Sequence, residues 1–124
     1  TLVLATACID DDELFEKQFS RYGRIIRNEE GDIIRIVEAK DATEEELAIR
    51  EVNVGFMAFD KEWAFDHLAN LKNDNAQEEY YLTDLVKIAF KENLVIHSVQ
   101  MNEKEALGAN TAEQLAVMEE YLER

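Results

Sequence analysis

The sequence predicts a layered α/β fold, and two observations carry that prediction. Apolar segments of strand length alternate, after one hairpin, with helix-length segments that begin at capping residues. The chain also has the length of a single domain, 124 residues, and a globular balance of 47% hydrophobic and 33% charged residues. We therefore expect one α/β domain with a modest hydrophobic core.

Strands are expected where short apolar segments are bounded by turn residues. The first residues, 1–8, are apolar without polar alternation, which is typical of a buried strand. Two later segments flank Gly31, a residue suited to a tight turn, and indicate a hairpin. The strands predicted in chain order are Thr1–Cys8, Arg24–Asn28, Asp32–Glu38, Val52–Phe59 and Leu94–Met101.

Helices are expected where a capping residue precedes an apolar periodicity. Thr43 with Glu46, and Thr111 with Gln114, form capping boxes, and Asp60 and Thr83 can cap two further helices. The predicted helices are a short one after Thr43, one from Asp60 to about Leu71, one from Thr83 through Lys91 and one after Thr111. In the third helix, Leu85, Ile88 and Ala89 are expected to face inward. In the fourth, an apolar stripe is formed by Leu115, Met118, Tyr121 and Leu122. Residues 10–20 are expected to form an acidic, irregular loop with one helical turn at most.

Composition excludes several classes of function. Lys and Arg number 13 and Asp and Glu 28, and the net charge of −15 repels nucleic-acid phosphates and anionic membranes. No apolar run approaches the roughly 20 residues that span a bilayer. The single cysteine, Cys8, excludes an internal disulfide and is expected to be a buried structural thiol. Nothing in the sequence indicates secretion, so a reducing cytoplasm is the expected compartment.

Two further features of the sequence set expectations. The chain opens at Thr1 inside an apolar run, without an initiator Met, so we expect a piece of a larger polypeptide. His67 lies beside Asp66 on a predicted helix and is expected at the surface or half-buried. With only His67 and His97 available, a histidine-based zinc site is disfavoured.

Three short clusters carry candidate chemistry. Gly23 stands where backbone could approach a ligand closely, Glu38 ends a predicted strand, and Asn53 places a polar amide inside an apolar strand. Each has an ordinary explanation: a turn glycine, a surface ion pair with Lys40, and a strand defect. Because strand ends of α/β sheets are common ligand sites, the three together favour a binding site.

These clusters, in this order, resemble the sugar-1-phosphate nucleotidyltransferases, or pyrophosphorylases, and most of all the uridylyltransferase domain that makes UDP-N-acetylglucosamine. The resemblance covers nearly the whole chain from Tyr22. The segments that carry it are Tyr22–Arg27, Ile36–Thr43, Ile49–Gly55, Asn73–Asp84 and Glu105–Leu115. It implies a Rossmann-like nucleotidyltransferase fold, of which residues 1–124 would be the sugar-binding C-terminal half, without the nucleotide-binding N-terminal half.

The resemblance also implies roles for particular residues. Gly23 would offer its N–H to the sugar, Glu38 would accept hydrogen bonds from it, and Asn53 would donate and accept beside them. Tyr81 and Thr83 would line the sugar pocket, and Asn110 would give an oxygen to Mg²⁺. Lys40 could approach the sugar phosphate. No residue of this chain is assigned a catalytic role.

The implied reaction is Mg²⁺-dependent transfer of UMP from UTP to N-acetylglucosamine 1-phosphate, a cytoplasmic step toward cell-wall precursors. The missing N-terminal half is the implied partner, and the chain alone is expected to be inactive. Two alternatives stay open: a non-catalytic sugar-nucleotide-binding or regulatory module, and a pyrophosphorylase for another hexose 1-phosphate or nucleotide. Two departures from the family pattern stand out: Glu78 replaces a common glycine, and residues 10–21 are longer than the usual turn.

Overall fold

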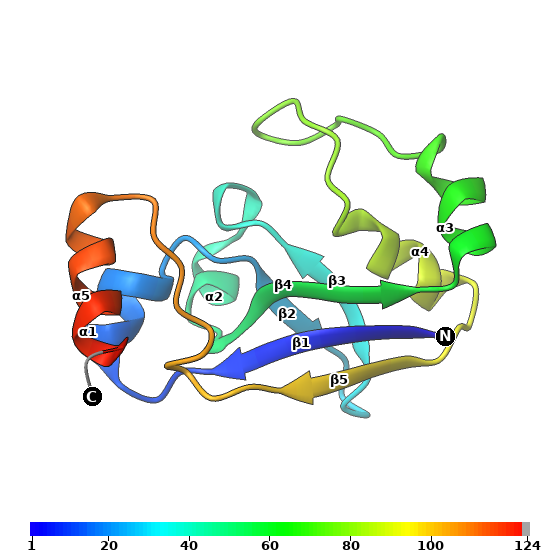
Figure 1. Ribbon diagram of the computed structural model, residues 1–124. Coiled ribbons are helices and arrows are strands. Elements are labelled where there is room, and N and C mark those ends of the chain that lie inside the picture. Colours follow the sequence, from blue (N-terminus) through cyan, green and yellow to red (C-terminus); the bar gives the residue numbers. More distant parts are fainter. Residues whose placement is uncertain (123–124) are drawn as a thin grey trace.

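The computed structural model describes residues 1–122 and consists of one mixed sheet with helices around it (Figure 1). The five strands lie in the order β3-β2-β4-β1-β5, with β1 and β5 parallel and the other pairs antiparallel. The strands are β1 Leu2–Cys8, β2 Arg24–Arg27, β3 Ile33–Val37, β4 Glu51–Phe59 and β5 Ile96–Gln100. This arrangement confirms the predicted α/β class and the predicted hairpin, whose Gly31 has a positive φ of 88°.

The helical segments lie mostly between the strands. Asp60 and Thr43 cap α3 and α2 as predicted, and Thr43 and Glu46 form the complete capping box. The segments are α1 Asp12–Leu14, the π-helical η1 Phe15–Phe19, the 3-10 turn η2 Ala39–Asp41, α2 Glu44–Leu47, α3 Lys61–Leu68, α4 Asp84–Lys91 and α5 Ala112–Leu122. No helix within residues 1–122 combines the length and apolarity needed to cross a membrane.

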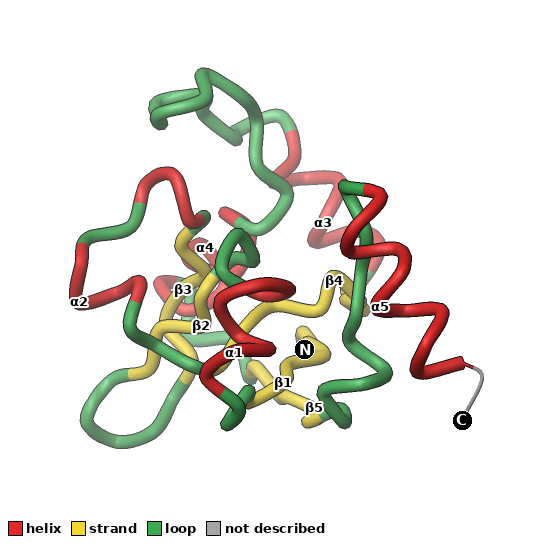
Figure 2. The backbone as a smooth tube through the Cα atoms, turned by 90° about the vertical axis from the view of Figure 1, so that its left-hand side faces the viewer, coloured by secondary structure: helices red, strands yellow, loops and turns green. Residues whose placement is uncertain are grey.

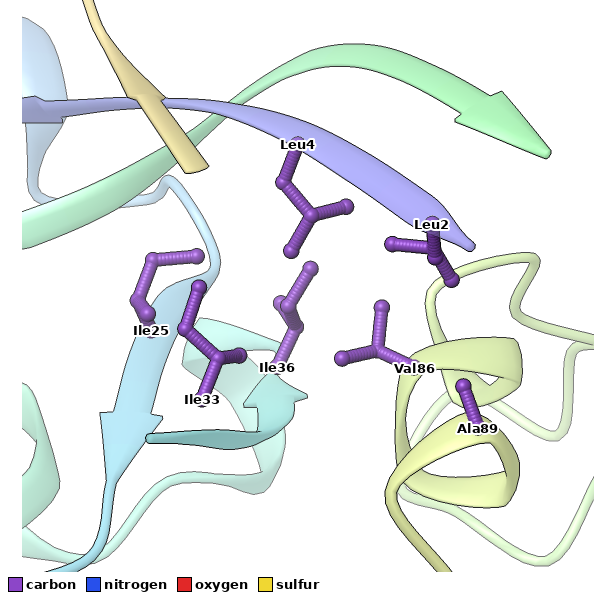
Figure 3. Close-up of a cluster of buried hydrophobic side chains, with 7 residues drawn as sticks. All are labelled: Leu2, Leu4, Ile25, Ile33, Ile36, Val86 and Ala89. Atoms are coloured by element: carbon purple, nitrogen blue, oxygen red, sulfur yellow. The ribbon is translucent and has the colours of Figure 1, made fainter. Parts of the chain in front are cut away.

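One hydrophobic cluster joins the sheet to α4 (Figure 3). Side chains of β1, β2 and β3 point toward the helix, and α4 closes the cluster from the other side. The buried members are Leu2, Leu4, Ile25, Ile33, Ile36, Val86 and Ala89. Val86 takes the inward place that the sequence pattern assigned to Ile88, because Leu85, Val86 and Ala89 are the buried residues of α4. Burial of each large apolar side chain stabilises the fold by about 1.5–3 kcal/mol.

A second cluster corrects the prediction of an irregular acidic loop at residues 10–20. Asp11 caps α1 by accepting a hydrogen bond from the N–H of Leu14 at 2.9 Å, and the π-helical segment η1 follows α1 directly. Phe15 and Phe19 of η1 are buried together with Ala7, Ile9, Val52 and Ala106. The many acidic residues made this stretch look like a loop, although Phe15 and Phe19, about one helical turn apart, form a local apolar face.

One other expectation is wrong, that of a buried Cys8, and two apolar segments are exposed because they lie at an edge of the sheet or domain. β5 forms as predicted but is the last strand of the sheet, and Val95 just before it and Val99 within it are each 57% exposed. Cys8 is exposed at the end of β1 rather than buried. The predicted stripe on α5 does not enter the core, since Leu115 is 50% exposed and Leu122 82%.

A hydrogen-bonded cluster joins α3 to the end of α4. Trp63 donates from Nε1 to Glu92 Oε2 at 2.8 Å, and its ring stacks on His67 at 4.7 Å. The ring nitrogens of His67 face the Trp63 carbonyl at 2.8 Å and Glu92 Oε1 at 2.9 Å. Both partners are acceptors, so the arrangement favours the doubly protonated imidazolium. The backbone and carboxylate acceptors raise the pKa of His67, and hydrogen bonds from Trp63 and His67 lower the pKa of Glu92.

We predict that Leu85→Ala destabilises the chain far more than Leu115→Ala. Both residues are helical, so their helix propensities match, but Leu85 is fully buried and Leu115 is half exposed. We expect a loss of about 3 kcal/mol for Leu85→Ala and under about 1 kcal/mol for Leu115→Ala. Urea denaturation measures both, and equal losses would contradict the core assignment.

We predict that His67→Gln removes part of the pH dependence of stability. The raised pKa of His67 means that its stabilising effect is complete below its ordinary value of 6.5 and is lost as pH rises through the higher folded value. The wild-type chain should therefore lose more free energy of unfolding between pH 6 and pH 8 than the variant. The control His97→Gln lies on exposed β5 and should keep the wild-type slope.

Candidate functional site

The centre of the candidate site is the carboxylate of Glu38, directly after β3. Thr83 donates from Oγ1 to Glu38 Oε1 at 3.0 Å. Thr83 was predicted to cap α4, but its side chain makes no capping hydrogen bond. Its hydroxyl instead joins residues separated by 45 positions in the sequence. The hydroxyl therefore holds the carboxylate at the end of the strand.

Gly23 brings its backbone against the same carboxylate. A Cβ atom at position 23 would lie 3.1 Å from Ile36 Cγ2 and 3.4 Å from Glu38 Oε2. Any side chain there would press on the β3 hairpin strand, so the close approach requires glycine. Gly23, Glu38 and Thr83, which the sequence assigned to one site, do lie together.

Asn53 reaches this site through its backbone. Its N–H donates to the Gly23 carbonyl at 2.8 Å. Its side-chain Oδ1 accepts from the N–H of Gly55 at 3.2 Å, where β4 is irregular and Gly55 has a φ of 108°. The amide thus supports a local irregularity of its own strand, the explanation that the sequence offered beside the binding role.

A cavity of about 440 Å³ lies between β3, α4 and the loop of residues 69–83, and both Glu38 and Tyr81 line it. This loop projects from the body of the domain (Figures 1 and 2). Tyr81 accepts from Gln77 Nε2 at 2.7 Å, and Asp41 Oδ1 accepts from the N–H of Ala76 at 2.6 Å, which ties the loop to η2. The cationic lining residues are Arg35, Lys72, Lys87 and Lys91. Lys40 is exposed and is not among the lining residues.

Asn110 is joined to the site indirectly. The Tyr22 hydroxyl donates to the Ala106 carbonyl at 3.0 Å, and a Cβ on Gly108 would lie 2.7 Å from that hydroxyl. Residues 106–108 are thereby held against the residue that precedes Gly23. Asn110 itself donates its N–H to Gln114 Oε1 at 2.8 Å. Among the described residues, no hydrogen bond joins its side chain to Glu38.

The second predicted capping box is only half formed. Gln114 donates its N–H to Thr111 Oγ1 at 3.1 Å, as predicted. The Gln114 side chain reaches the N–H of Asn110 rather than that of Thr111. The helix start therefore fixes the backbone of Asn110 and leaves its amide exposed.

Burial and neighbouring carboxylates control the charge of the site. Burial raises the pKa of Glu38, and Asp41 and Asp84 raise it further, whereas the Thr83 hydrogen bond lowers it. Burial also raises the pKa of Asp84. Within residues 1–122, the Glu38 carboxylate accepts a hydrogen bond from Thr83 alone, which leaves acceptor positions for groups that donate hydrogen bonds.

The departure at Glu78 has a visible backbone consequence. Glu78 has a φ of +53°, the left-handed region in which residues with a side chain are disfavoured. Its N–H donates to the Asn75 carbonyl at 3.1 Å and closes a turn in the 69–83 loop. The glycine common at this place in the resembling family would adopt the same turn without that cost.

Sequence reasoning missed some residues that shape the site. Asp41 and Tyr22 lie inside the resembling segments but received no role, although they anchor the 69–83 loop and residues 106–108. Their partners lie 35 and 84 positions away, and no local pattern reports such contacts. The one sequence signal that could have indicated a role for Asp41 and Tyr22 was the position of their polar groups within apolar or strand-end segments.

We predict that Glu38→Gln makes the chain more stable at neutral pH. A carboxyl group whose pKa is raised by folding contributes most below its ordinary value of 4.5, and that contribution is lost as pH rises through the higher folded value. The amide removes this loss. Between pH 4 and pH 7, the midpoint temperature of thermal unfolding should fall for wild type relative to that of Glu38→Gln. The midpoint of the control Glu30→Gln, in the exposed hairpin turn, should follow that of wild type.

Comparison of the sequence with known proteins finds clear relatives of this chain. No protein-family model matches the chain. It is 49% identical to the bifunctional protein GlmU of Paraburkholderia xenovorans over 106 residues, 85% of this chain and 23% of that protein. It is 50% identical over 81% of its length to the GlmU of Dechloromonas aromatica, and 44% identical over 99% to that of a Marinomonas strain.

The chain spans between 22% and 26% of the length of these three relatives. The similarity confirms the family resemblance that the sequence motifs indicated, and it agrees with the predicted nucleotidyltransferase-like fold. Over most of its residues, the chain is therefore homologous to one segment of the bifunctional GlmU proteins.

Proposed function

We propose that the chain is the sugar-binding part of a sugar-nucleotide pyrophosphorylase that transfers UMP from UTP to N-acetylglucosamine 1-phosphate. The observation that carries this proposal is the approach of the Gly23 backbone to the Glu38 carboxylate, which is held by Thr83. The homology to proteins named bifunctional supports a transferase of this family. We also place the reaction in the cytoplasm.

The proposed site binds a sugar through complementary groups at fixed positions. A sugar hydroxyl both donates and accepts hydrogen bonds, so it needs an acceptor and a donor together. Glu38 supplies the acceptor, and the Gly23 N–H supplies the donor. Tyr81, on the wall of the cavity, and Asn53, beside Gly23, would complete the surroundings of the sugar.

The proposed reaction needs positioning more than covalent help from the protein. An oxygen of the sugar phosphate attacks the α-phosphorus of UTP, a new P–O bond forms, and the bond to the leaving pyrophosphate breaks. Holding the two reactants in line supplies much of the rate. This chain would hold the sugar, and the nucleotide would be held by a further part of the same domain.

A magnesium ion is implied by the family, and the described residues fit it only in part. Mg²⁺ prefers several oxygen ligands in octahedral geometry. Within residues 1–122, no group of three or more His, Cys, Asp or Glu side chains could hold a metal. We propose Asn110 as one ligand, because its amide is exposed beside the segment held by Tyr22, and we derive no step through the ion.

A non-catalytic binding module is the competing function. It would keep Gly23, Glu38 and Asn53 and would need no nucleotide site. The absence of an acidic metal cluster among the described residues is compatible with such a module. The two functions differ in turnover by the complete protein rather than in sugar binding.

We predict that the chain binds N-acetylglucosamine 1-phosphate and that Glu38→Ala weakens this binding by about tenfold or more, as expected for loss of a partly buried acceptor. Calorimetric titration measures the dissociation constant. Glu30→Ala in the exposed turn is the control and should bind as wild type. Equal affinity of Glu38→Ala and wild type would remove Glu38 from the site. A panel of other hexose 1-phosphates identifies the sugar.

We also predict that the purified chain releases no pyrophosphate from UTP and the sugar phosphate in the presence of Mg²⁺, while the complete natural protein does. Sustained release by the chain alone would refute the assignment of a sugar-binding part. Binding without turnover by the complete protein would favour the module.

A further inference from the structure

Arg24 is a buried cation whose partners are backbone carbonyls. It is 1% exposed, and no carboxylate of the described residues forms an ion pair with it. Nη1 donates to the carbonyls of Ser20 at 2.9 Å and Tyr22 at 2.5 Å, and Nη2 donates to the carbonyl of Leu47 at 3.1 Å. Its guanidinium carbon also lies 4.9 Å from the centre of the Phe15 ring. One side chain thus joins η1, the approach to β2 and the end of α2.

These contacts fix the orientation of the peptide between Tyr22 and Gly23. That peptide is trans, because the chain has no cis peptide bond among its described residues. In a trans peptide the C=O and N–H point in opposite directions. The Tyr22 carbonyl is directed to Arg24, so the Gly23 N–H is directed away from it.

The Gly23 N–H is left for a ligand. The Gly23 carbonyl accepts from Asn53, but within residues 1–122 no acceptor is paired with the N–H. Gly23 is buried, and a buried N–H without a partner is costly. The nearest polar atoms to its missing side chain are the two oxygens of Glu38, at 3.4 and 3.5 Å. A backbone donor and a carboxylate acceptor therefore lie close to each other.

We propose that Arg24 is a positioning residue for sugar binding: by holding the Tyr22 carbonyl it aims the Gly23 N–H so that this donor and Glu38 engage the same sugar. The inference rests on the proposed function. Lysine cannot replace arginine here, because a single ammonium lacks the planar fork that reaches carbonyls on separate segments. A purely structural role would affect stability without changing the Gly23 amide or the affinity for sugar phosphate.

The test compares Arg24→Lys with Arg50→Lys in the full chain. Arg50 is a matched control: its guanidinium also lies over the Phe15 ring, at 4.3 Å, but its hydrogen bonds go to Ile9 and Asp12. Thermal unfolding first defines a temperature at which both variants are folded. Titration with N-acetylglucosamine 1-phosphate then gives dissociation constants, and NMR gives the Gly23 amide resonance.

We expect the dissociation constant to rise about tenfold in Arg24→Lys and to change less than about twofold in Arg50→Lys, the size of effect that one misdirected hydrogen bond to the sugar would have. The Gly23 amide resonance should move in Arg24→Lys even without ligand. Unchanged affinity and an unmoved Gly23 resonance in Arg24→Lys would overturn the inference while leaving the proposed function intact. No binding by wild type would instead refute the proposed function.

A measurement on the wild-type chain keeps the inference testable if Arg24→Lys does not fold. The Tyr22 carbonyl and Arg24 guanidinium resonances should show their hydrogen bond before ligand is added and should stay in place on titration. The Gly23 amide should shift with ligand. A bond between Tyr22 and Arg24 that forms only with ligand would contradict positioning by a preformed contact.

Discussion

The pairing of β1 on both of its edges is the constraint on which the rest of the structure depends. β1 pairs with β4 on one side and β5 on the other. It gives Leu2 and Leu4 to the cluster against α4 and Ala7 to the cluster against η1. β4 in turn holds β2 through the pair of Arg24 and Val52. The position of Glu38, directly after the β2–β3 hairpin, therefore depends on β1, although β1 contributes no group to the site.

The site depends on polar side chains that form hydrogen bonds with residues distant in the sequence rather than with their own local backbone. Thr83 stands at the start of α4, yet its hydroxyl holds Glu38. Asp41 lies in a short turn, yet its carboxylate fixes the 69–83 loop. Such substitutions of a tertiary partner for a local one cost little, because each hydrogen bond is exchanged rather than lost. Their result is a carboxylate that is half-buried, restrained and still able to accept hydrogen bonds.

The sequence was sufficient for features with a local cause. The hairpin around Gly31, the caps at Thr43 and Asp60 and the strand at 51–59 each follow from patterns within a few residues. It was insufficient where the outcome depends on neighbours in space. Val99 is apolar but lies in the edge strand β5 and is exposed. The acidic stretch at 10–20 forms helical segments because Phe15 and Phe19 pack into the second cluster. Gly23 and Glu38 could be grouped from their motifs, whereas the turn of the Asn53 amide toward Gly55 depends on an irregularity in β4.

The partners of Arg24 also determine how the site responds to salt. The chain carries a net charge of −15, and pairs such as Lys17 with Glu13 are exposed to solvent. Dissolved ions screen exposed charges beyond about 8 Å at physiological ionic strength. The Arg24 guanidinium is buried and bound to carbonyl dipoles over hydrogen-bond distances, where mobile ions do not enter. Rising salt therefore relieves repulsion among the surface carboxylates while the peptide beside the proposed sugar site keeps its direction.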